Sequence, residues 1–380
     1  MSAVRFRPTP QINPIQFDSG FLLPLLLRKQ SSNHHPLNNI FEYRFDFEEL
    51  SSFLPKQKGK TAVLCDTNSL QHCWPKIGSN GALKDAEIIE IEPGEESKSL
   101  EVAANLWQTL LELKFDRRDT LICLGGGVIT DLGGFIGATY KRGINTFHIP
   151  TSLLGMVDAS IGGKTGINFQ GLKNQIGTFE RELKTLICPQ FLDTLPQEEL
   201  LSGFAEMIKH GVLDSAQHLN QLKSLDSVDA ESISSLVEQS ARFKERIVTL
   251  DFQESGVRQQ LNFGHTLGHA IEAITHTRNQ PLSHGHCVAL GMVVELNLHE
   301  NKSKNFLKLK SEVNQLIASF FDKSPLATIT TIDLTPYLLH DKKNQGDSIM
   351  MTKLDGIGTY AGVYPVNIDH LDQALFESIE

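Results

Sequence analysis

The sequence predicts an α/β N-terminal domain with a parallel sheet, followed by a mostly α-helical C-terminal domain. Strand-like and helix-like segments alternate between about residues 41 and 199, which is typical of a parallel sheet with helices on both faces. From about residue 200 the apolar residues recur with helical periodicity instead. A chain of 380 residues is long enough for two such domains, each with a buried core.

The elements of the first domain, taken in order, follow from local patterns. Strands are predicted where apolar residues alternate or run together up to a turn, at FEYRFDF (41–47), TAVLCDT (61–67), AEIIEIEPGE (86–95), DTLICLGGG (119–127) and NTFHIPTS (145–152). Helices are predicted at EELSSFLP (48–55), SLEVAANLWQTLLELKF (99–115) and the second half of the segment 119–140. Before them, residues 1–40 are rich in Pro, Asn, Gln and Ser, so we expect a partly disordered extension.

The second domain, 200–380, is built from amphipathic or apolar helical segments. The segments with this period are LLSGFAEMIKHGVL (200–213), ESISSLVEQSARFKERIVTLD (231–251), LNFGHTLGHAIEAITH (261–276), CVALGMVVELNLHE (287–300) and FLKLKSEVNQLIASFF (306–321). We expect three parts in total: the extension 1–40, the α/β domain 41–199 and the helical domain 200–380.

Composition excludes several classes of protein. The net charge of -10 argues against non-specific nucleic-acid binding, which depends on Lys and Arg that neutralise phosphates. Five Cys, with no closely spaced pair, favour a reduced cytoplasmic protein. The apolar run FLLPLLL (21–27) is too short to span a membrane and lacks a following small-residue cleavage site. We therefore expect neither a membrane nor a nucleic acid as a partner.

Two glycine-rich stretches carry the pattern of an anion-binding backbone. Gly125, Gly126 and Gly127 lie between a predicted strand and a predicted helix, where free N–H groups can approach a phosphate. The triplet is not the usual dinucleotide fingerprint, and a tight strand–helix turn would explain it equally well. The stretch 151–168 places Asp158 and Lys164 among small residues, and Lys173 and Asn174 follow it. Such isolated cations suit a phosphorylated ligand, although a solvated loop is the alternative.

Acidic and imidazole side chains in the helical domain form a candidate metal or proton-handling site. Glu206 and Lys209, at i and i+3, interrupt an apolar segment, as a buried pair or as an exposed ion pair. His265, His269, His284 and His286 then fall within 22 positions. The spacing of the first two matches the HExxH zinc motif, but Thr266 replaces its glutamate, which disfavours a peptidase. At least one of the four imidazoles is expected to be merely packed or at the surface.

A polar cluster is predicted beside these histidines. Arg258 and Asn262 precede His265 by seven and three residues, so one continuous helix would place all three on about the same face. With Lys244 and Glu254 they make a set of charges that folding alone does not require. The segment LLHDKKNQG (338–346) reads, on its own, as a surface loop.

Seven motifs together resemble the 3-dehydroquinate synthase family of sugar-phosphate cyclases. In chain order they are GGGVITDLGGFIGATYKRG, PTSLLGMVDASIGGKTGIN, LKNQIGTF, FAEMIKHG, LNFGHTLGHAIE, SHG and DKKN. The resemblance covers about residues 41 to 370. It implies a Rossmann-like NAD-binding domain, a helical metal domain and a cytoplasmic homodimer.

The resemblance also implies an activity. Such enzymes convert 3-deoxy-D-arabino-heptulosonate 7-phosphate to 3-dehydroquinate and phosphate, in the shikimate pathway of aromatic amino acid biosynthesis. NAD⁺ transiently oxidises an alcohol beside a zinc or cobalt ion, phosphate leaves by β-elimination, the hydride returns and an intramolecular aldol reaction closes the ring. The cofactor and metal carry most of this chemistry, and the protein supplies placement and charge.

Site residues follow from the resemblance by motif match. The metal ligands would be Glu206, His265 and His284. The NAD⁺ contacts would be Asp66, Asn68, Glu95, Lys98, Gly126, Gly127, Val128, Asp131, Thr151, Ser152, Lys173 and Thr194. The substrate contacts would be Asp158, Lys164, Asn174, Lys209, Lys244, Arg258, Asn262 and either Lys342 or Lys343. The catalytic group would comprise Glu254 and His269, which match acid–base positions, with Lys164, Asn174 and Arg142, the last reaching a phosphate across the dimer.

Departures from the family pattern leave one histidine without a role. The usual HGE reads HGH here, so His286 replaces an acid, and we expect it to point away from the metal because neighbouring residues rarely ligate one ion well. Three other functions are compatible with parts of this pattern: a sister cyclase acting on sedoheptulose 7-phosphate, a metal-dependent polyol dehydrogenase and an inactive paralogue. The residues expected to bind a substrate carboxylate and phosphate are all present, which favours 3-dehydroquinate synthase.

Overall fold

The computed structural model describes residues 41–43, 50–53, 59–170, 172–339 and 349–379. Within them the α/β part contains a six-stranded sheet in which every neighbouring pair is parallel. Its strands, in spatial order, are β1 (Phe41–Tyr43), β8 (Lys184–Ile187), β5 (Asn145–Pro150), β4 (Thr120–Gly125), β2 (Thr61–Asp66) and β3 (Glu87–Ile91). The predicted extension 1–40 and the lysines Lys342 and Lys343 lie outside the described residues.

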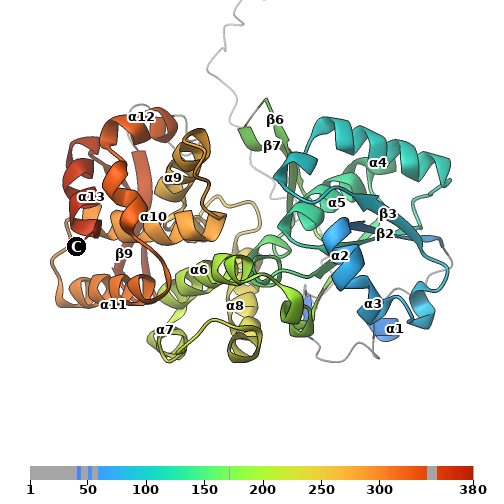
Figure 1. Ribbon diagram of the computed structural model, residues 1–380, viewed down its shortest axis with the longest axis horizontal. Helices are drawn as coiled ribbons and strands as arrows, with labels where there is room; N and C mark the ends of the chain where they lie inside the picture. The colour runs from blue at the N-terminus through green and yellow to red at the C-terminus, as the bar shows by residue number, and fades with distance from the viewer. Residues whose placement is uncertain (1–40, 44–49, 54–58, 171, 340–348, 380) are drawn as a thin grey trace, which may run out of the picture. The chain divides into compact units, whose positions relative to one another are not determined.

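Helices cover both faces of this sheet, as the sequence predicts, because successive side chains of each buried strand point to opposite faces. Leu64 and Cys123 face one way and pack with apolar residues of α4 (Leu100–Glu112) and α5 (Gly127–Thr139). Val63 and Ile122 face the other way, toward a core that includes residues of the short helices α1 (Leu50–Phe53) and α3 (Trp74–Ile77). Figure 1 shows α4 and α5 together beside the strands β2 and β3.

The strand order reverses direction between β2 and β4. The chain passes from β2 through α2 (Thr67–His72) and α3 to its neighbour β3, and then crosses back to β4 on the other side of β2. From β4 it continues outward to β5. In open α/β sheets the crevice beside the carboxyl ends of two such strands is the usual ligand-binding position. The ends of β2 and β4, at Asp66 and Gly125, mark this point.

An antiparallel hairpin follows the sheet strand β5, and the sequence analysis did not predict it. Its strands are β6 (Lys164–Phe169) and β7 (Leu172–Phe179), so the second glycine-rich stretch is partly a hairpin rather than a loop. Glycine makes the pairing close: a Cβ on Gly177 would lie 2.1 Å from the carbonyl oxygen of Thr165. The low apolar content and many glycines hid the strand pattern.

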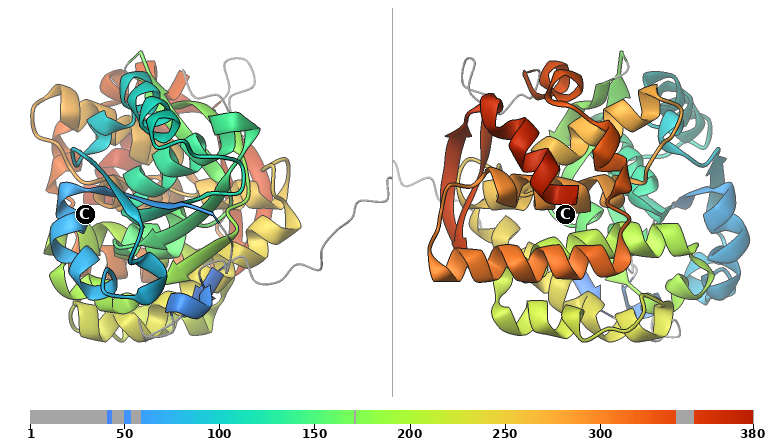
Figure 2. Two further views of the ribbon diagram at one scale, coloured as in Figure 1. Left: turned by 90° about the vertical axis from the view of Figure 1, so that its right-hand side faces the viewer. Right: turned by 60° about the vertical axis from the view of Figure 1, so that its left-hand side comes forward.

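The second part of the chain is mostly helical, as predicted. Its helices are α6 (Gln197–Asp214), α7 (Ala216–Lys223), α8 (Ala230–Leu250), α9 (His265–Thr277), α10 (His284–Leu298), α11 (Lys304–Phe320), α12 (Thr331–Leu339) and α13 (Leu371–Ile379). Helix α10 is apolar around its circumference and packs on α6, α9, α11 and α13. Figure 2 shows α11 (orange) and α13 (dark red) on the same side of this part.

An antiparallel hairpin also lies inside the helical part. Its strands β9 (Ile349–Gly356) and β10 (Thr359–Val366) were not predicted from the sequence. Residues of α6, α8 and the sheet belong to one apolar core, so packing joins the two parts. The boundary at residues 199 and 200 therefore stays a prediction. Among the described residues, none of the helices has both the length and the apolar character needed to cross a bilayer.

The predicted continuous helix through Arg258, Asn262 and His265 is wrong. Residues Val257–Asn262 form a short 3-10 helix, and α9 begins separately at His265. Gly264 breaks the path with a φ of +76°, a left-handed conformation that favours glycine. A Cβ at this position would lie 2.4 Å from Cγ of Met292, so α10 also requires glycine here.

Candidate active site

Three helices bring one carboxylate and two imidazoles together. Glu206 on α6 is fully buried, and its Oε1 lies 3.3 Å from Nε2 of His265 at the start of α9. The same oxygen lies 3.8 Å from Nε2 of His284 at the start of α10. One ligand atom from each residue lies within 4.8 Å of the other two, close enough for a single ion. The spacing along the chain, 59 and 19 residues, reflects helix packing and cannot be read as a local motif.

Both imidazoles are held so that Nε2 faces the carboxylate. Nδ1 of His265 lies 3.1 Å from the carbonyl oxygen of Phe263 and can donate to it. Nδ1 of His284 lies 3.3 Å from Oε2 of Glu272 on α9. A histidine that donates from one ring nitrogen presents the other as a lone pair, as metal-ligating histidines usually do.

The charges around Glu206 fit a divalent cation. Burial disfavours the ionised carboxylate, but the Lys209 ammonium beside it outweighs burial, and the pKa of Glu206 is lowered. Burial and the same ammonium lower the pKa of His265, which leaves its ring neutral at pH 7. Oε2 of Glu206 pairs with the Lys209 ammonium, and Oε1 faces the Nε2 atoms of His265 and His284. An anionic oxygen and two imidazoles make a three-ligand set that leaves coordination positions for a substrate.

A group of buried cations adjoins the three ligands. Lys244 on α8 lies 2.8 Å from Oδ1 of Asp158 and also donates to the carbonyl oxygen of that residue, at 2.6 Å. Lys209 approaches the same carboxylate at 3.8 Å, and His210 at 3.6 Å. The Lys244 and Lys209 ammonium groups hold the pKa of Asp158 well below its usual range, although burial alone would raise it. The sequence predicted Asp158, Lys209 and Lys244 in this place but not His210.

A second polar group joins the 3-10 helix to the β6–β7 hairpin. Glu254 forms an ion pair with Lys164, and its Oε1 accepts a hydrogen bond from Nδ2 of Asn262 at 3.0 Å. Arg258 is 2% exposed, and its guanidinium donates to the carbonyl oxygens of Gly162 and Phe252. All four predicted residues of this region are therefore close in space, although they do not share one helix.

The carboxyl ends of the parallel strands carry the residues expected to bind a nucleotide. Asp66 is the last residue of β2 and caps α2, where its side chain accepts from the backbone N–H of Ser69 at 2.7 Å. Gly126 and Gly127 follow β4, and Thr151 and Ser152 follow β5.

The glycine turn after β4 fits a phosphate. A Cβ on Gly126 would lie 3.1 Å from Oγ of Ser152, and one on Gly127 would lie 3.2 Å from Cβ of Ala159. Helix α5 begins at Gly127 without a side-chain cap, so its first N–H groups can face an anion. The turn stands at the strand-order reversal, which is where a dinucleotide fits.

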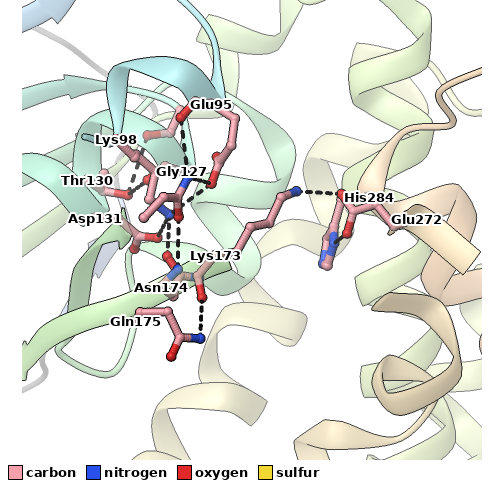
Figure 3. A network of polar contacts seen from close by, with 12 residues as sticks. Glu95, Lys98, Gly127, Thr130, Asp131, Lys173, Asn174, Gln175, Glu272 and His284 are labelled. Atoms are coloured by element: carbon pink, nitrogen blue, oxygen red, sulfur yellow. Dashed lines mark hydrogen bonds and ion pairs between the residues drawn. The ribbon is translucent and has the colours of Figure 1, made fainter. Parts of the chain in front are cut away.

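A lysine-centred network connects the strand ends to the hairpin (Figure 3). The Lys98 ammonium lies 2.7 Å from Oδ2 of Asp131 and 2.6 Å from Oδ1 of Asn174. Glu95 approaches it at 3.5 Å and also accepts a hydrogen bond from Asn168. Asn174 adopts a φ of +52°, which an asparagine tolerates better than most residues. Asn168, which the sequence analysis missed, receives the backbone N–H of Asn174 at 2.8 Å and so fixes this turn.

The neighbouring lysine of the hairpin points toward the helical part. Lys173 forms an ion pair with Oε1 of Glu272 at 2.7 Å, and Glu272 in turn contacts His284 (Figure 3). Sequence reasoning placed Lys173 near NAD⁺ and did not single out Glu272. The only available signal was the acid at the end of LNFGHTLGHAIE, which faces His284 through tertiary packing.

Three predicted residues, Arg142, Asn68 and Thr194, lie apart from these groups, whereas His269 lies beside two of the metal ligands. His269 is exposed, with its ring centroid 5.5 Å from that of His265 and 5.7 Å from that of His284. Arg142 follows the far end of α5, about 20 Å along the helix from Gly127. Asn68 is exposed on α2, and Thr194 donates to the carbonyl oxygen of Phe191. His286 faces away, as expected: its Nε2 lies 2.8 Å from the carbonyl oxygen of Asp322 and its ring packs on Phe321.

Comparison with protein families gives two matches that together span most of the described chain. Residues 88–202 match the family model for the 3-dehydroquinate synthase N-terminal region, and residues 203–344 match the model for its C-terminal region. A 3-dehydroquinate synthase from Parabacteroides distasonis is 42% identical over 318 residues, which is 82% of this chain and 89% of that protein. The enzyme of the same name from Latilactobacillus sakei is 40% identical over 276 residues, which is 71% of this chain and 75% of that protein.

Solved structures agree on the fold. A 2-deoxy-scyllo-inosose synthase complexed with carbaglucose-6-phosphate, NAD⁺ and Co²⁺ superposes with a TM-score of 0.76 at 21% identity, covering 89% of this chain and 96% of that one. A 2-epi-5-epi-valiolone synthase from Streptomyces hygroscopicus with NAD⁺ and Zn²⁺ gives the same TM-score, 0.76, and coverage of 89% and 96% at 22% identity. At this level of identity the likeness establishes the fold alone.

Proposed function

Because this chain belongs to the 3-dehydroquinate synthase family, we propose that its site converts 3-deoxy-D-arabino-heptulosonate 7-phosphate to 3-dehydroquinate and phosphate. The protein is an enzyme of this type, a phosphate-eliminating lyase of the shikimate pathway. When bound, NAD⁺ supplies a hydride acceptor, and a divalent cation supplies Lewis acidity at the substrate oxygens. The other roles belong to side chains of the chain itself.

The metal ligands in this proposal are Glu206, His265 and His284. Support comes from the convergence of their ligand atoms within 4.8 Å, from the two Nδ1 contacts and from the burial of the Glu206 carboxylate. Zinc and cobalt both suit one carboxylate and two imidazoles. This convergence is the single observation that carries the proposal.

The NAD⁺ site in this proposal is the crevice at the strand-order reversal. Its phosphates would face the N-terminus of α5 at Gly126, Gly127 and Val128. The remaining contacts come from segments that follow the sheet strands and from the β6–β7 hairpin. They would be Asp66, Asn68, Glu95, Lys98, Asp131, Thr151, Ser152, Lys173 and Thr194. Support comes from the glycine geometry and from the Lys98 network, which holds a buried ammonium between Asp131 of α5 and Asn174 of the hairpin.

The substrate site in this proposal lies between the metal ligands and the hairpin. Lys209, Lys244 and Arg258 supply buried positive charge for a substrate that carries a carboxylate and a phosphate. Asp158 orients two of these cations, and Lys164, Asn174 and Asn262 offer further donors. Glu254, held by Lys164 and Asn262, and His269, exposed beside the metal ligands, are the proposed acid–base groups. Lys342 and Lys343 remain candidates outside the described residues.

We further propose a cytoplasmic homodimer. Apolar side chains lie exposed along the hairpin and just after it, at Phe169, Leu172, Ile176, Phe179 and Leu183. Several exposed apolar side chains on one hairpin favour burial against a second chain. Arg142, remote from the Gly126–Gly127 turn of its own chain, would then serve the phosphate site of the partner.

Phosphate release from two related heptulose phosphates tests the assignment. The purified protein, with NAD⁺ and Zn²⁺ or Co²⁺, is mixed with 3-deoxy-D-arabino-heptulosonate 7-phosphate or with sedoheptulose 7-phosphate, which lacks the carboxylate. We expect release from the first substrate, because Lys244 and Arg258 provide partners for its carboxylate. Release from sedoheptulose 7-phosphate alone would refute the proposal and identify a sister cyclase.

A further inference from the structure

Glu272 is a buried carboxylate whose two oxygens contact different elements. It lies on α9, with a side chain 7% exposed. Oε2 is 3.3 Å from Nδ1 of His284, the first residue of α10, and Oε1 is 2.7 Å from the Lys173 ammonium on β7. The close-up in Figure 3 shows the Lys173 ammonium and the His284 ring both directed at Glu272. The proposed metal, NAD⁺, substrate and acid–base sites do not include this carboxylate.

His284 needs such a partner because of its position. It begins α10, so only one side of the residue is fixed by helical backbone, and its side chain is partly exposed. Rotation of the ring about the Cβ–Cγ bond would turn Nε2 away from Glu206 and His265 and remove one of the three metal ligands. An acceptor at Nδ1 prevents this rotation and fixes the tautomer that leaves Nε2 unprotonated.

Glu272 in turn needs a second partner. A buried carboxylate is costly unless both oxygens are paired, and the single contact with an imidazole would leave Oε1 unsatisfied. Lys173 reaches it from the hairpin, with about half of the lysine side chain exposed. The lysine therefore limits the orientations that the carboxylate can adopt.

We propose that Glu272 is a positioning residue that fixes His284 for metal binding and that Lys173, through its ion pair with Glu272, connects the β6–β7 hairpin to the metal ligands. This inference rests on the proposed metal site of Glu206, His265 and His284. It assigns Glu272 to the support of a ligand and not to ligation.

One other arrangement of the same side chains is geometrically available. Ligand atoms of His269, Glu272 and His284 also lie within 4.8 Å of one another, so Glu272 could itself bind a cation. The ammonium of Lys173 at 2.7 Å disfavours this arrangement, because it occupies Oε1 and repels a second positive charge.

Metal affinity, measured without NAD⁺ or substrate, tests the proposal. Co²⁺ binding to the full chain is determined by competition with a chromogenic chelator for wild type, Glu272→Gln, Glu272→Asp and Glu272→Ala. Gln retains the reach and an acceptor oxygen but loses the charge, whereas Asp retains the charge and withdraws the oxygen by one methylene. Circular dichroism and thermal unfolding establish that each variant is folded.

We expect the Co²⁺ affinity to depend on the length of the side chain at position 272 and not on its charge. Asp and Ala should weaken Co²⁺ binding roughly 10- to 100-fold, and Gln should weaken it much less. In Co²⁺-loaded protein, the paramagnetically shifted proton on Nδ1 of His284 should exchange slowly with water in wild type and rapidly in the Asp and Ala variants. Affinity retained in Asp but lost in Gln would overturn the proposal, because charge would then decide. Wild-type affinity and a protected proton in both Asp and Ala would overturn it too.

Lys173→Met tests the second half of the proposal against a matched control. We expect a roughly two- to fivefold loss of Co²⁺ affinity, as for one half-exposed ion pair. Lys310 on α11 forms a comparable ion pair, with its Nζ 3.3 Å from Oε2 of Glu377. Lys310→Met breaks this pair and should leave the Co²⁺ affinity unchanged. Equal affinities in the two variants would remove Lys173 from the proposal.

The outcome separates this inference from the proposed function. Wild-type protein that binds Co²⁺ tightly but releases no phosphate from the heptulosonate would contradict the function and leave the role of Glu272 standing. Wild-type protein that turns over, with Glu272→Ala binding Co²⁺ normally, would contradict only the role of Glu272.

Discussion

At the scale of single residues, charge pairing decides where the buried ionisable side chains of the site can lie. Glu206, Lys209 and Asp158 are tolerated in the interior because each faces an opposite charge. The sequence indicated most members of this set, since charged residues in apolar segments stand out. It could not indicate Glu272, because the contact with His284 depends on how α9 packs beside α10.

Glu182 differs from these residues, since no cation lies in hydrogen-bond distance of its carboxyl group among the described residues. Burial raises the pKa of Glu182 from 4.5 to about 7. The folded protein thus keeps a proton that the unfolded chain releases above pH 4.5. The resulting stability is fully present below pH 4.5 and is lost as the pH rises through 7.

A stability measurement across pH tests this shift. Glu182→Gln removes the titrating group. The free energy of unfolding of the variant minus that of wild type should therefore increase from pH 5 to pH 8, by up to about 3 kcal/mol. Urea unfolding at both pH values measures the difference. Glu180→Gln, an exposed position two residues earlier, serves as the control and should show no such dependence. A pH-independent difference for Glu182→Gln would contradict the raised pKa.

At the scale of elements, close helix packing sets the distance between the proposed metal ligands. Gly285 on α10 meets α6 directly, because a Cβ there would lie 2.0 Å from the carbonyl oxygen of Ser202. The backbone N–H of Gly285 also donates to Oγ of Ser202 at 3.0 Å. His284 and Glu206 therefore approach each other only while these two helices remain in contact.

Gly285→Ala should move α10 away from α6. We expect a loss of about 1–3 kcal/mol in the free energy of unfolding, from overpacking. We also expect a fall in Co²⁺ affinity of roughly tenfold or more, because a ligand is displaced. Denaturant unfolding and chelator competition measure the two effects. Gly81→Ala, where the added Cβ meets nothing within 4 Å, is the control, and equal behaviour of the two variants would refute this account of α10.

The elements also show where sequence patterns stop being informative. The helices α4 to α6 and five of the six sheet strands could be predicted, because apolar periodicity reports burial directly, whereas the four-residue strand β8 was not predicted. The break at Gly264 could not, since LNFGHTLGHAIE keeps helical spacing on both sides of a residue with φ of +76°. The hairpins β6–β7 and β9–β10 were not predicted for a related reason. Their stability comes from pairing between the two strands and from packing against neighbouring elements, and local composition does not report either contact.

At the scale of the whole molecule, the exposed apolar side chains of the hairpin predict self-association. Light scattering should give twice the chain mass of 42.2 kDa for wild type. Leu172→Asp, at a residue 59% exposed, should shift the protein toward monomer because a charge would be buried in the interface. Ile332→Asp on α12, also highly exposed, should remain dimeric, and equal behaviour of the two variants would place the interface elsewhere.

The proposed function depends on the position of one cation, and anomalous diffraction from crystals grown with Co²⁺ or Zn²⁺ locates that cation directly. We predict one strong peak for each chain, about 2.0–2.2 Å from an oxygen of Glu206 and from Nε2 of His265 and His284. Glu272 should lie behind His284, outside bonding distance of the ion. A peak ligated by His269 and Glu272, or by Asp158 and His210, with none between Glu206, His265 and His284, would contradict the account.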